Sequence, residues 1–102
     1  MSKSEIMLLA RKYAELVREK VDSEAIIYLF GSAARGDMHQ NSDIDIAVVS
    51  ETFDSDVCRN YARIAVFAGN VSWDIEPHAI LAEDMIKTTP FTKAVIREGV
   101  LI

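Results

Sequence analysis

The sequence predicts a mixed α/β domain of the α+β kind, in which a small mixed β-sheet is packed with helices. Hydrophobic residues recur with helical spacing toward both ends of the chain, and short β-branched runs lie between them. The chain has 102 residues, of which 50% are hydrophobic and 26% are charged. This balance supports one hydrophobic core. Because no repeat, low-complexity tract or linker interrupts the sequence, we expect residues 1–102 to form a single domain.

A helix is expected at the start of the chain. Between residues 4 and 21 the apolar side chains follow a three-to-four spacing, and Ser2 with Glu5 has the form of a capping box. The next run, residues 25–30, is β-branched and aromatic, is too short for a helix and is bounded by Gly31. This run predicts a buried strand.

The middle of the chain predicts a second strand and a second helix. Residues 43–49 alternate at first and then become wholly apolar, as a central strand does near its polar end. Residues 55–68 carry a helical apolar face. Asp54 or Ser55 is expected to cap the start of this helix, and Gly69 to follow its end.

The last part of the chain completes a sheet of three or four strands. Residues 71–76 alternate between apolar and polar, which predicts a strand that ends near Pro77 and directs Trp73 into the core. A helix is expected over residues 90–98, followed by a short edge strand over 100–102. The expected order before that edge strand is therefore α-β-β-α-β-α.

Composition argues against several classes of partner. Eleven Lys and Arg against sixteen Asp and Glu give a net charge of −5, whereas a protein that coats duplex DNA or an anionic membrane needs a basic face. The longest apolar run, residues 25–30, is far shorter than the roughly 20 residues of a membrane span. The single cysteine, Cys58, fits a reducing compartment and is expected to be a buried, inert thiol. We therefore expect a cytoplasmic protein that binds neither membrane nor duplex nucleic acid.

Two carboxylates on the second predicted strand suggest a metal site. Asp43 and Asp45 are two positions apart, so they point to the same face and lie about 7 Å apart along the backbone. Carboxylates at this separation can bind a hard cation such as Mg²⁺, which takes oxygen ligands and often shares them with phosphates. A polar strand edge that faces water is the alternative interpretation of this pair.

The turn after the first predicted strand suggests a phosphate site. Gly31 leaves backbone N–H groups open to a close phosphate approach, and Ser32 adds a hydroxyl donor. If Ala33 opens a short helix, its N-terminus adds positive potential. Arg35 can meet a phosphate oxygen or pair with Asp37. A phosphate cradle beside two carboxylates is what metal-assisted phosphoryl or nucleotidyl transfer requires.

These residues resemble a known signature. Gly31-Ser32, ten intervening residues and then Asp43-x-Asp45 is similar to the motif of the polymerase-β-like nucleotidyltransferase superfamily. The fuller Gly-Ser-x-Ala-Arg-Gly and Ser-Asp-Ile-Asp-Ile-Ala-Val pattern resembles the minimal nucleotidyltransferase (MNT) branch. The resemblance implies the polymerase-β-like nucleotidyltransferase fold. It also implies that Gly31 and Ser32 hold the β- and γ-phosphates while Asp43 and Asp45 bind Mg²⁺.

The resemblance further implies a third carboxylate on the later strand, for which two residues compete. Glu76, in Ile-Glu-Pro-His, resembles a motif of some MNT members and is favoured, whereas Asp74, in Trp-Asp-Ile, resembles the more common Val-Asp-Leu form. The expected catalytic and metal-binding residues are Asp43, Asp45 and Glu76, with Asp74 as the alternative. The expected nucleotide-binding residues are Gly31, Ser32 and Arg35.

His78 shares the alternating face of Glu76 if the strand continues past Pro77. It would then orient a carboxylate or touch substrate, although a hydrogen-bonded structural role is the commoner one for such a histidine.

The resulting expectation is a Mg²⁺-dependent enzyme that transfers a nucleoside monophosphate, with AMP from ATP favoured, to an acceptor hydroxyl. MNT members that this chain resembles are often antitoxins that add AMP to a tyrosine of a HEPN-domain ribonuclease, so a HEPN-type partner is expected. The alternative is a non-catalytic module that docks on and neutralises a helical partner. A transferase for a small acceptor such as an aminoglycoside would need an added acceptor domain. Because little chain remains to form an acceptor pocket, a homo- or hetero-oligomer is expected.

Overall fold

Helices and strands alternate along most of the chain, of which the computed structural model describes residues 1–36 and 43–102. In chain order the elements are α1 (Lys3–Lys20), β1 (Ile26–Phe30), α2 (Gly31–Arg35), β2 (Ile44–Ser50), α3 (Val57–Ala68), β3 (Ile75–Leu81), α4 (Ala82–Lys87), α5 (Pro90–Glu98) and β4 (Val100–Leu101). None of the helices in these two ranges is long and apolar enough to cross a membrane.

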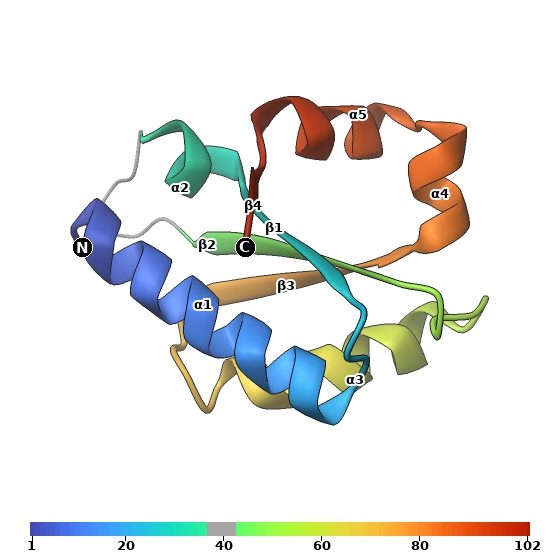
Figure 1. Cartoon of the computed structure of the whole chain (residues 1–102), viewed down its shortest axis with the longest axis horizontal. Helices are drawn as coiled ribbons and strands as arrows, with labels where there is room; N and C mark the ends of the chain where they lie inside the picture. The colour runs from blue at the N-terminus through green and yellow to red at the C-terminus, as the bar shows by residue number, and fades with distance from the viewer. Residues whose placement is uncertain (37–42) are drawn as a thin grey trace.

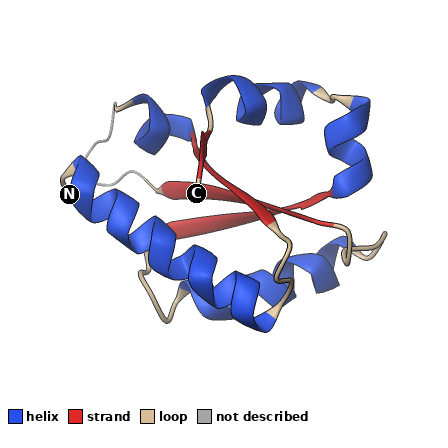
Figure 2. Cartoon of the chain, viewed as in Figure 1, coloured by secondary structure: helices blue, strands red, loops and turns tan. Residues whose placement is uncertain are grey.

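The described strands form one mixed sheet in the order β3-β2-β1-β4 (Figures 1 and 2). β1 is antiparallel to both β2 and β4, whereas β2 and β3 are parallel. The predicted mixed sheet packed with helices is therefore confirmed. With this topology the C-terminal end of β1 and the N-terminal ends of β2 and β3 lie side by side. We call this end of the strands the Asp45 edge.

Both faces of the sheet are covered, which explains why β2 becomes wholly apolar. Ile44, Ile46 and Val48 point toward α1 and α3, and Ala47 and Val49 point toward the side of α4 and α5. In Figure 1 the first pair of helices lies below the sheet and the second pair above it. The face shared by Asp45, Ala47 and Val49 is therefore the one that α5 flanks.

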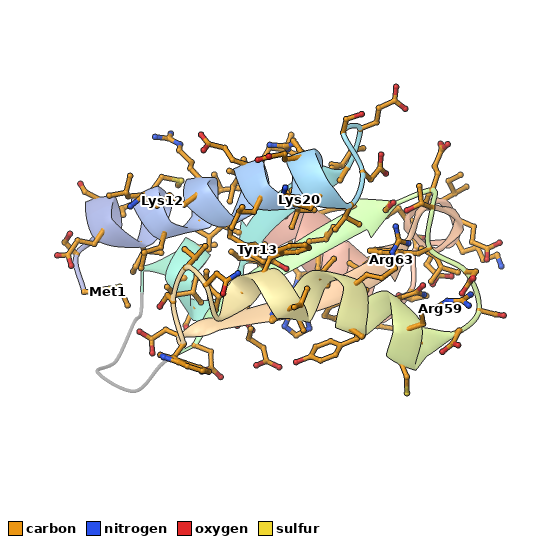
Figure 3. The ribbon with its side chains drawn as sticks, turned by 90° about the horizontal axis from the view of Figure 1, so that it is seen from below. Met1, Lys12, Tyr13, Lys20, Arg59 and Arg63 are labelled. Atoms are coloured by element: carbon orange, nitrogen blue, oxygen red, sulfur yellow. The ribbon has the colours of Figure 1, made fainter. Side chains whose placement is uncertain are left out.

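The contact between α1 and α3 is anchored by a buried tyrosine. Figure 3 shows Tyr13 of α1 lying between the two helices. Its hydroxyl donates a hydrogen bond to the carbonyl oxygen of Ile64 in α3, at 2.8 Å. Both residues are fully buried, so the bond holds the two helices in a fixed relation under the sheet.

The start of α1 agrees with the predicted capping box, and the start of α3 corrects the predicted cap. Ser2 accepts from the backbone N–H of Glu5, whose side chain accepts from Ser2 in return. α3 is capped by Asp56 instead of Asp54 or Ser55. The carboxylate of Asp54 is engaged elsewhere, because it accepts from the backbone of Asp56 and pairs with the guanidinium of Arg59.

The buried face of α3 includes one polar residue among apolar ones. The helix buries Asn60, Ile64 and Ala68, spaced four residues apart, and Cys58 is exposed. The prediction of a buried thiol is therefore wrong. Asn60 can be buried because its amide is satisfied: the side chain donates to the carbonyl of Asp54 at 2.7 Å and accepts from the N–H of the same residue.

The third strand lies further along the chain than predicted. β3 begins at Ile75 and continues through Pro77 to Leu81, and the residues before it form a turn that follows α3. Trp73 lies in this turn and is 92% exposed, so its predicted core position is wrong. A proline can occupy β3 because this strand is at the edge of the sheet, where a missing N–H costs little. The short helix α4, which follows β3, was not predicted from the sequence.

Candidate active site

The predicted site residues meet where β1 ends and β2 and β3 begin. Asp45 of β2 pairs with Phe30 on one side and with Glu76 of β3 on the other. Paired residues of adjacent strands point to the same face, so the carboxylates of Asp45 and Glu76 share the face that α5 flanks. Asp43 directly precedes β2 and is exposed. The fold therefore places Asp45 and Glu76, two of the three predicted carboxylates, directly opposite each other on adjacent strands.

The turn at Gly31 lies directly against Asp45. Gly31 has a φ of +70°, and a Cβ atom added there would lie 2.5 Å from Oδ2 of Asp45. Both the left-handed backbone and the close approach require glycine. The partly buried Ser32 follows in the five-residue helix α2. The predicted phosphate turn and a predicted metal ligand are thus in direct contact.

Arg35 has a carboxylate partner on α5. Its Nη1 atom lies 3.1 Å from Oε2 of Glu98, which joins α2 to α5. Of the two predicted partners of Arg35, Asp37 lies outside the described residues. Both side chains of the observed pair are partly exposed, so the interaction is one that solvent weakens.

His78 lies within hydrogen-bonding distance of Asp45. Because β3 continues past Pro77, His78 shares the face of Glu76, and its Nε2 lies 3.1 Å from Oδ1 of Asp45. The imidazole also packs against Phe30 at 5.0 Å and Phe91 at 5.8 Å between ring centroids. The two-residue spacing of Glu76 and His78 was the only sequence signal for this contact.

The two candidates for the third carboxylate occupy different positions. Glu76 is part of β3 and pairs with Asp45. Asp74 precedes the strand, where its carbonyl accepts from the N–H of Ile44 at 2.7 Å and its own N–H donates to Ser72 at 3.1 Å. Both side chains are exposed. The ladder therefore aligns Glu76, and not Asp74, with Asp45.

The donor chemistry at this edge fits a hard divalent cation. Asp43, Asp45 and Glu76 offer only carboxylate oxygens, which are the ligands that Mg²⁺ prefers. Within residues 1–36 and 43–102, no three His, Cys, Asp or Glu side chains lie close enough to form a complete metal cluster. The close approach of Asp45 to the Gly31 turn nevertheless places one oxygen ligand beside the predicted phosphate cradle.

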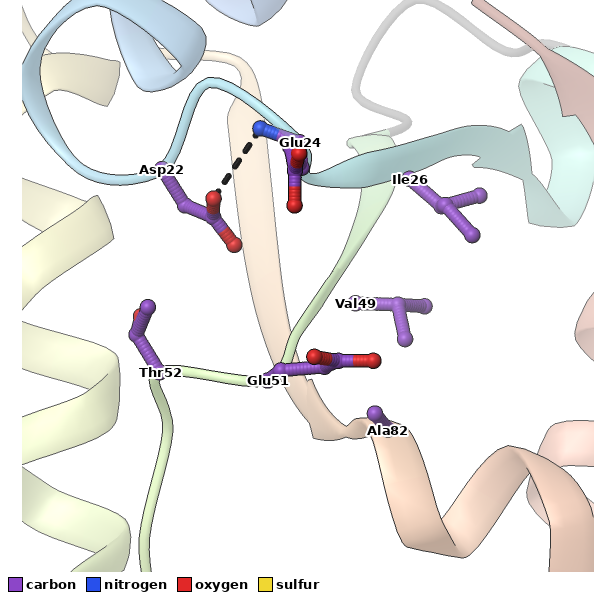
Figure 4. A pocket seen from close by; sticks show the side chains of 7 residues that line it. All are labelled: Asp22, Glu24, Ile26, Val49, Glu51, Thr52 and Ala82. Atoms are coloured by element: carbon purple, nitrogen blue, oxygen red, sulfur yellow. Dashed lines mark hydrogen bonds between the residues drawn. The ribbon is translucent and has the colours of Figure 1, made fainter.

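A separate cavity of about 190 Å³ lies at the opposite end of the β1–β2 pair (Figure 4). Acidic and apolar side chains line it: Asp22, Glu24, Ile26, Val49, Glu51, Thr52 and Ala82. The Ser50 hydroxyl donates a hydrogen bond to the Asp22 carboxylate at 2.6 Å, and the backbone N–H of Glu24 donates a second one. Together the two hydrogen bonds lower the pKa of the Asp22 carboxyl. The cavity is remote from the Asp45 edge. The candidate site is therefore identified by its carboxylates and its glycine turn, and not by a cavity.

A mixed sheet whose first strand ends in a glycine–serine turn against a carboxylate of the second strand defines a nucleotidyltransferase fold. The chain belongs to the family described as the nucleotidyltransferase domain, whose sequence model matches residues 10–100.

One curated relative agrees with this assignment, and solved structures share the fold. The chain is 44% identical over 52 residues to the protein adenylyltransferase MntA of Shewanella oneidensis, a match that covers 51% of this chain and 34% of that relative. It thus matches about a third of the length of that protein. A mutant of the toxin–antitoxin MntA–HpeT has a TM-score of 0.66 and 22% identity, covering 90% of this chain and 70% of that one. A toxin–antitoxin structure with AMP-PNP has a TM-score of 0.62 and 22% identity, covering 99% and 72%.

Proposed function

We propose that this chain is a Mg²⁺-dependent nucleotidyltransferase that transfers AMP from ATP to an acceptor hydroxyl. The observation that carries the proposal is the contact of the Gly31 turn with Asp45, which itself pairs with Glu76. Membership of the nucleotidyltransferase domain family and the similarity to a protein adenylyltransferase support it. The toxin–antitoxin structure with AMP-PNP supports an adenine nucleotide.

The proposed reaction divides the site residues by role. The N–H groups of the Gly31–Ser32 turn would hold the β- and γ-phosphates, and Arg35 would reach a phosphate oxygen by leaving Glu98. Asp43, Asp45 and Glu76 would hold Mg²⁺. When bound, Mg²⁺ offsets the charge of the triphosphate and polarises the phosphoryl group under attack.

The bond changes of the proposed reaction balance without a further reactant. The acceptor oxygen forms a bond to the α-phosphorus, the bond from that phosphorus to the β-phosphate oxygen breaks, and pyrophosphate leaves with that oxygen. The acceptor proton passes to a carboxylate, for which the exposed Glu76 is placed beside Asp45.

The acceptor that we propose is a tyrosine of a HEPN-type toxin, bound as a partner protein. The similarity to the MntA–HpeT toxin–antitoxin supports a toxin as partner, and the name of the adenylyltransferase relative supports a protein as acceptor. The tyrosine and the HEPN class of the toxin follow from the resemblance to MNT members alone. A partner, or a second copy of the chain, would complete the acceptor pocket as an oligomer. We assign the reaction to the cytoplasm because it consumes a nucleoside triphosphate and because the lone Cys58 suits a reducing compartment.

A second candidate function is neutralisation of a helical partner by docking alone. The observation that favours it is a shallow groove beside α3 that is lined by two exposed aromatic residues, Tyr61 and Trp73. Exposed apolar groups of this kind are typical of protein-binding surfaces. Docking of this type would need none of the three carboxylates.

The test is transfer of labelled AMP from ATP to the co-purified toxin in the presence of Mg²⁺. Asp43→Asn and Asp45→Asn should abolish transfer while the circular dichroism spectrum is unchanged, because both residues lie at the polar start of a strand. If both variants neutralise the toxin as well as the wild-type chain does, docking alone is the function.

The same assay separates the two candidates for the third carboxylate. Glu76→Gln should lower single-turnover transfer by roughly 10²-fold or more, as loss of a catalytic acid–base group does. Asp74→Asn is the matched control and should cost much less. The opposite result would assign the role to Asp74, and activity in both variants would leave Asp43 and Asp45 as the working pair.

A further inference from the structure

The two oxygens of Asp45 have different surroundings. Oδ1 lies 3.1 Å from Nε2 of His78, whereas Oδ2 faces the turn at Gly31. The side chain of Asp45 is only 27% exposed and that of His78 only 31% exposed. The carboxylate plane is therefore defined by a hydrogen bond on one side and a backbone turn on the other.

The imidazole of His78 is itself held by two aromatic rings. Phe30 packs against it edge to face at 5.0 Å, and Phe91 of α5 lies at 5.8 Å. The two phenyl rings contact each other at 5.7 Å with an interplanar angle of 81°. Edge-to-face contacts of this kind are favourable aromatic geometries, so the ring has little freedom to turn.

The register of the sheet explains how His78 reaches Asp45. His78 pairs with Ala47, and Asp45 lies two residues before Ala47 on the same face. Because Ala47 has only a methyl side chain, the imidazole can lie over it and reach the neighbouring carboxylate. An ionised carboxylate can only accept hydrogen bonds, so the proton of the neutral imidazole belongs on Nε2.

We infer that His78 is a positioning residue that orients Asp45 toward the Gly31 turn. The inference rests on the proposed function, in which Asp45 holds Mg²⁺ beside the turn that binds the phosphates of ATP. The hydrogen bond from Nε2 stops rotation of the carboxylate about its terminal torsion, so Oδ2 stays directed at the turn. Outer partners that fix ligand orientation in this way typically contribute 10- to 100-fold in metal affinity or activity.

Two substitutions separate the hydrogen bond from the packing. His78→Phe keeps an aromatic ring between Phe30 and Phe91 but has no donor. His78→Gln loses the ring but keeps an N–H donor that can approach the position of Nε2. We expect His78→Phe to weaken calorimetric binding of ATP with Mg²⁺, and to lower single-turnover transfer, by about tenfold or more. His78→Gln should remain within a few-fold of wild type in both measurements.

A reversed order, with His78→Phe more active than His78→Gln, would assign His78 to packing alone and overturn the inference. Equal wild-type values in both variants would overturn it as well. If the wild-type chain neither binds ATP with Mg²⁺ nor transfers AMP, the proposed function fails.

The hydrogen bond can be examined without activity. Long-range proton–nitrogen correlation spectra at mildly alkaline pH, assigned with His78→Gln, should show His78 as the Nε2–H form in the wild-type chain. Asp45→Ala should convert this signal to a mixture of tautomers. An unchanged tautomer in Asp45→Ala would show that Asp45 does not hold the imidazole, whatever the state of the reaction.

Discussion

Gly31 is required both by its left-handed backbone and by the close approach of Asp45. Gly36, at the other end of the same short helix, allows the two requirements to be separated. Gly31 has a φ of +70° and Gly36 a φ of +83°, so a side chain at either position is strained. Only at Gly31 would the added Cβ meet Asp45, whereas none of the described residues lies within 4 Å of a Cβ added at Gly36. The two glycines therefore separate backbone strain from displacement of the carboxylate.

We predict that Gly31→Ala and Gly36→Ala each lower the free energy of unfolding by about 1–2 kcal/mol, the cost of a left-handed L-residue. Gly31→Ala should in addition lose ATP binding in the presence of Mg²⁺ by about tenfold or more, because it pushes Asp45 away from the turn. Urea unfolding and calorimetry measure the two effects. Equal nucleotide affinity in the two variants would show that the approach of Gly31 to Asp45 has no part in the site.

At the scale of elements, the contact between α1 and α3 depends on the Tyr13 hydroxyl. Tyr13→Phe removes the hydrogen bond from this hydroxyl to the carbonyl oxygen of Ile64, which should cost about 0.5–1.5 kcal/mol in the free energy of unfolding. Tyr61→Phe is the matched control, since the Tyr61 hydroxyl belongs to an exposed side chain. Urea unfolding near neutral pH should show a measurable effect for the first variant and almost none for the second.

The same hydroxyl predicts a loss of stability at high pH. Burial raises the pKa of the Tyr13 phenol above its ordinary value of about 10. Stabilisation from the neutral phenol is therefore complete below pH 10 and is lost as the pH rises from there toward the folded pKa. Tyr13→Phe should show a flatter profile than wild type over this alkaline range. Parallel profiles for the two proteins would contradict the assignment.

Asp22, in the connection from α1 to β1, predicts a loss of stability at low pH. The pKa of the Asp22 carboxyl is lowered by the hydrogen bond from Ser50 and by the N–H of Glu24. Its contribution to stability is present above the ordinary pKa of about 3.9 and is lost as the pH falls through the lower folded value. Ser50→Ala should flatten the acid limb of the unfolding profile, and an unchanged limb would exclude this bond as its cause.

At the scale of the whole molecule, the fluorescence of the single tryptophan reports on the protein surface and not on the core. Trp73 is 92% exposed, so we predict that its fluorescence maximum and its quenching by acrylamide change little when urea unfolds the chain. Far-ultraviolet circular dichroism should show the transition that the fluorescence misses. A large shift of the emission on unfolding would place Trp73 in an apolar environment in the folded protein, against the structure.

Trp73 also reports on a partner. If a toxin docks on the groove lined by Tyr61 and Trp73, its addition should shift the emission to shorter wavelength and protect the indole from acrylamide. Binding of the toxin with unchanged quenching would place the interface elsewhere on the chain.

Sequence patterns were sufficient for three elements that depend on their own neighbours. The spacing and capping box of α1, the short apolar run of β1 and the bounds of α5 each follow from local geometry. The mixed sheet follows from their order, and the Gly31–Ser32 and Asp43-x-Asp45 spacing indicated the family. These features rely on periodicity, caps and turns, whose causes lie within a few residues.

Only the tertiary structure decided the position of β3 and the partners of its side chains. Pro77 predicts the end of a strand unless that strand lies at an edge, and no local pattern reveals where a strand will lie in its sheet. The contact of His78 with Asp45 joins residues 33 positions apart, and that of Arg35 with Glu98 joins residues 63 apart. Register, edge position and such contacts arise from packing between distant segments, so the sequence determined which groups carry the chemistry and the fold decided which of them meet.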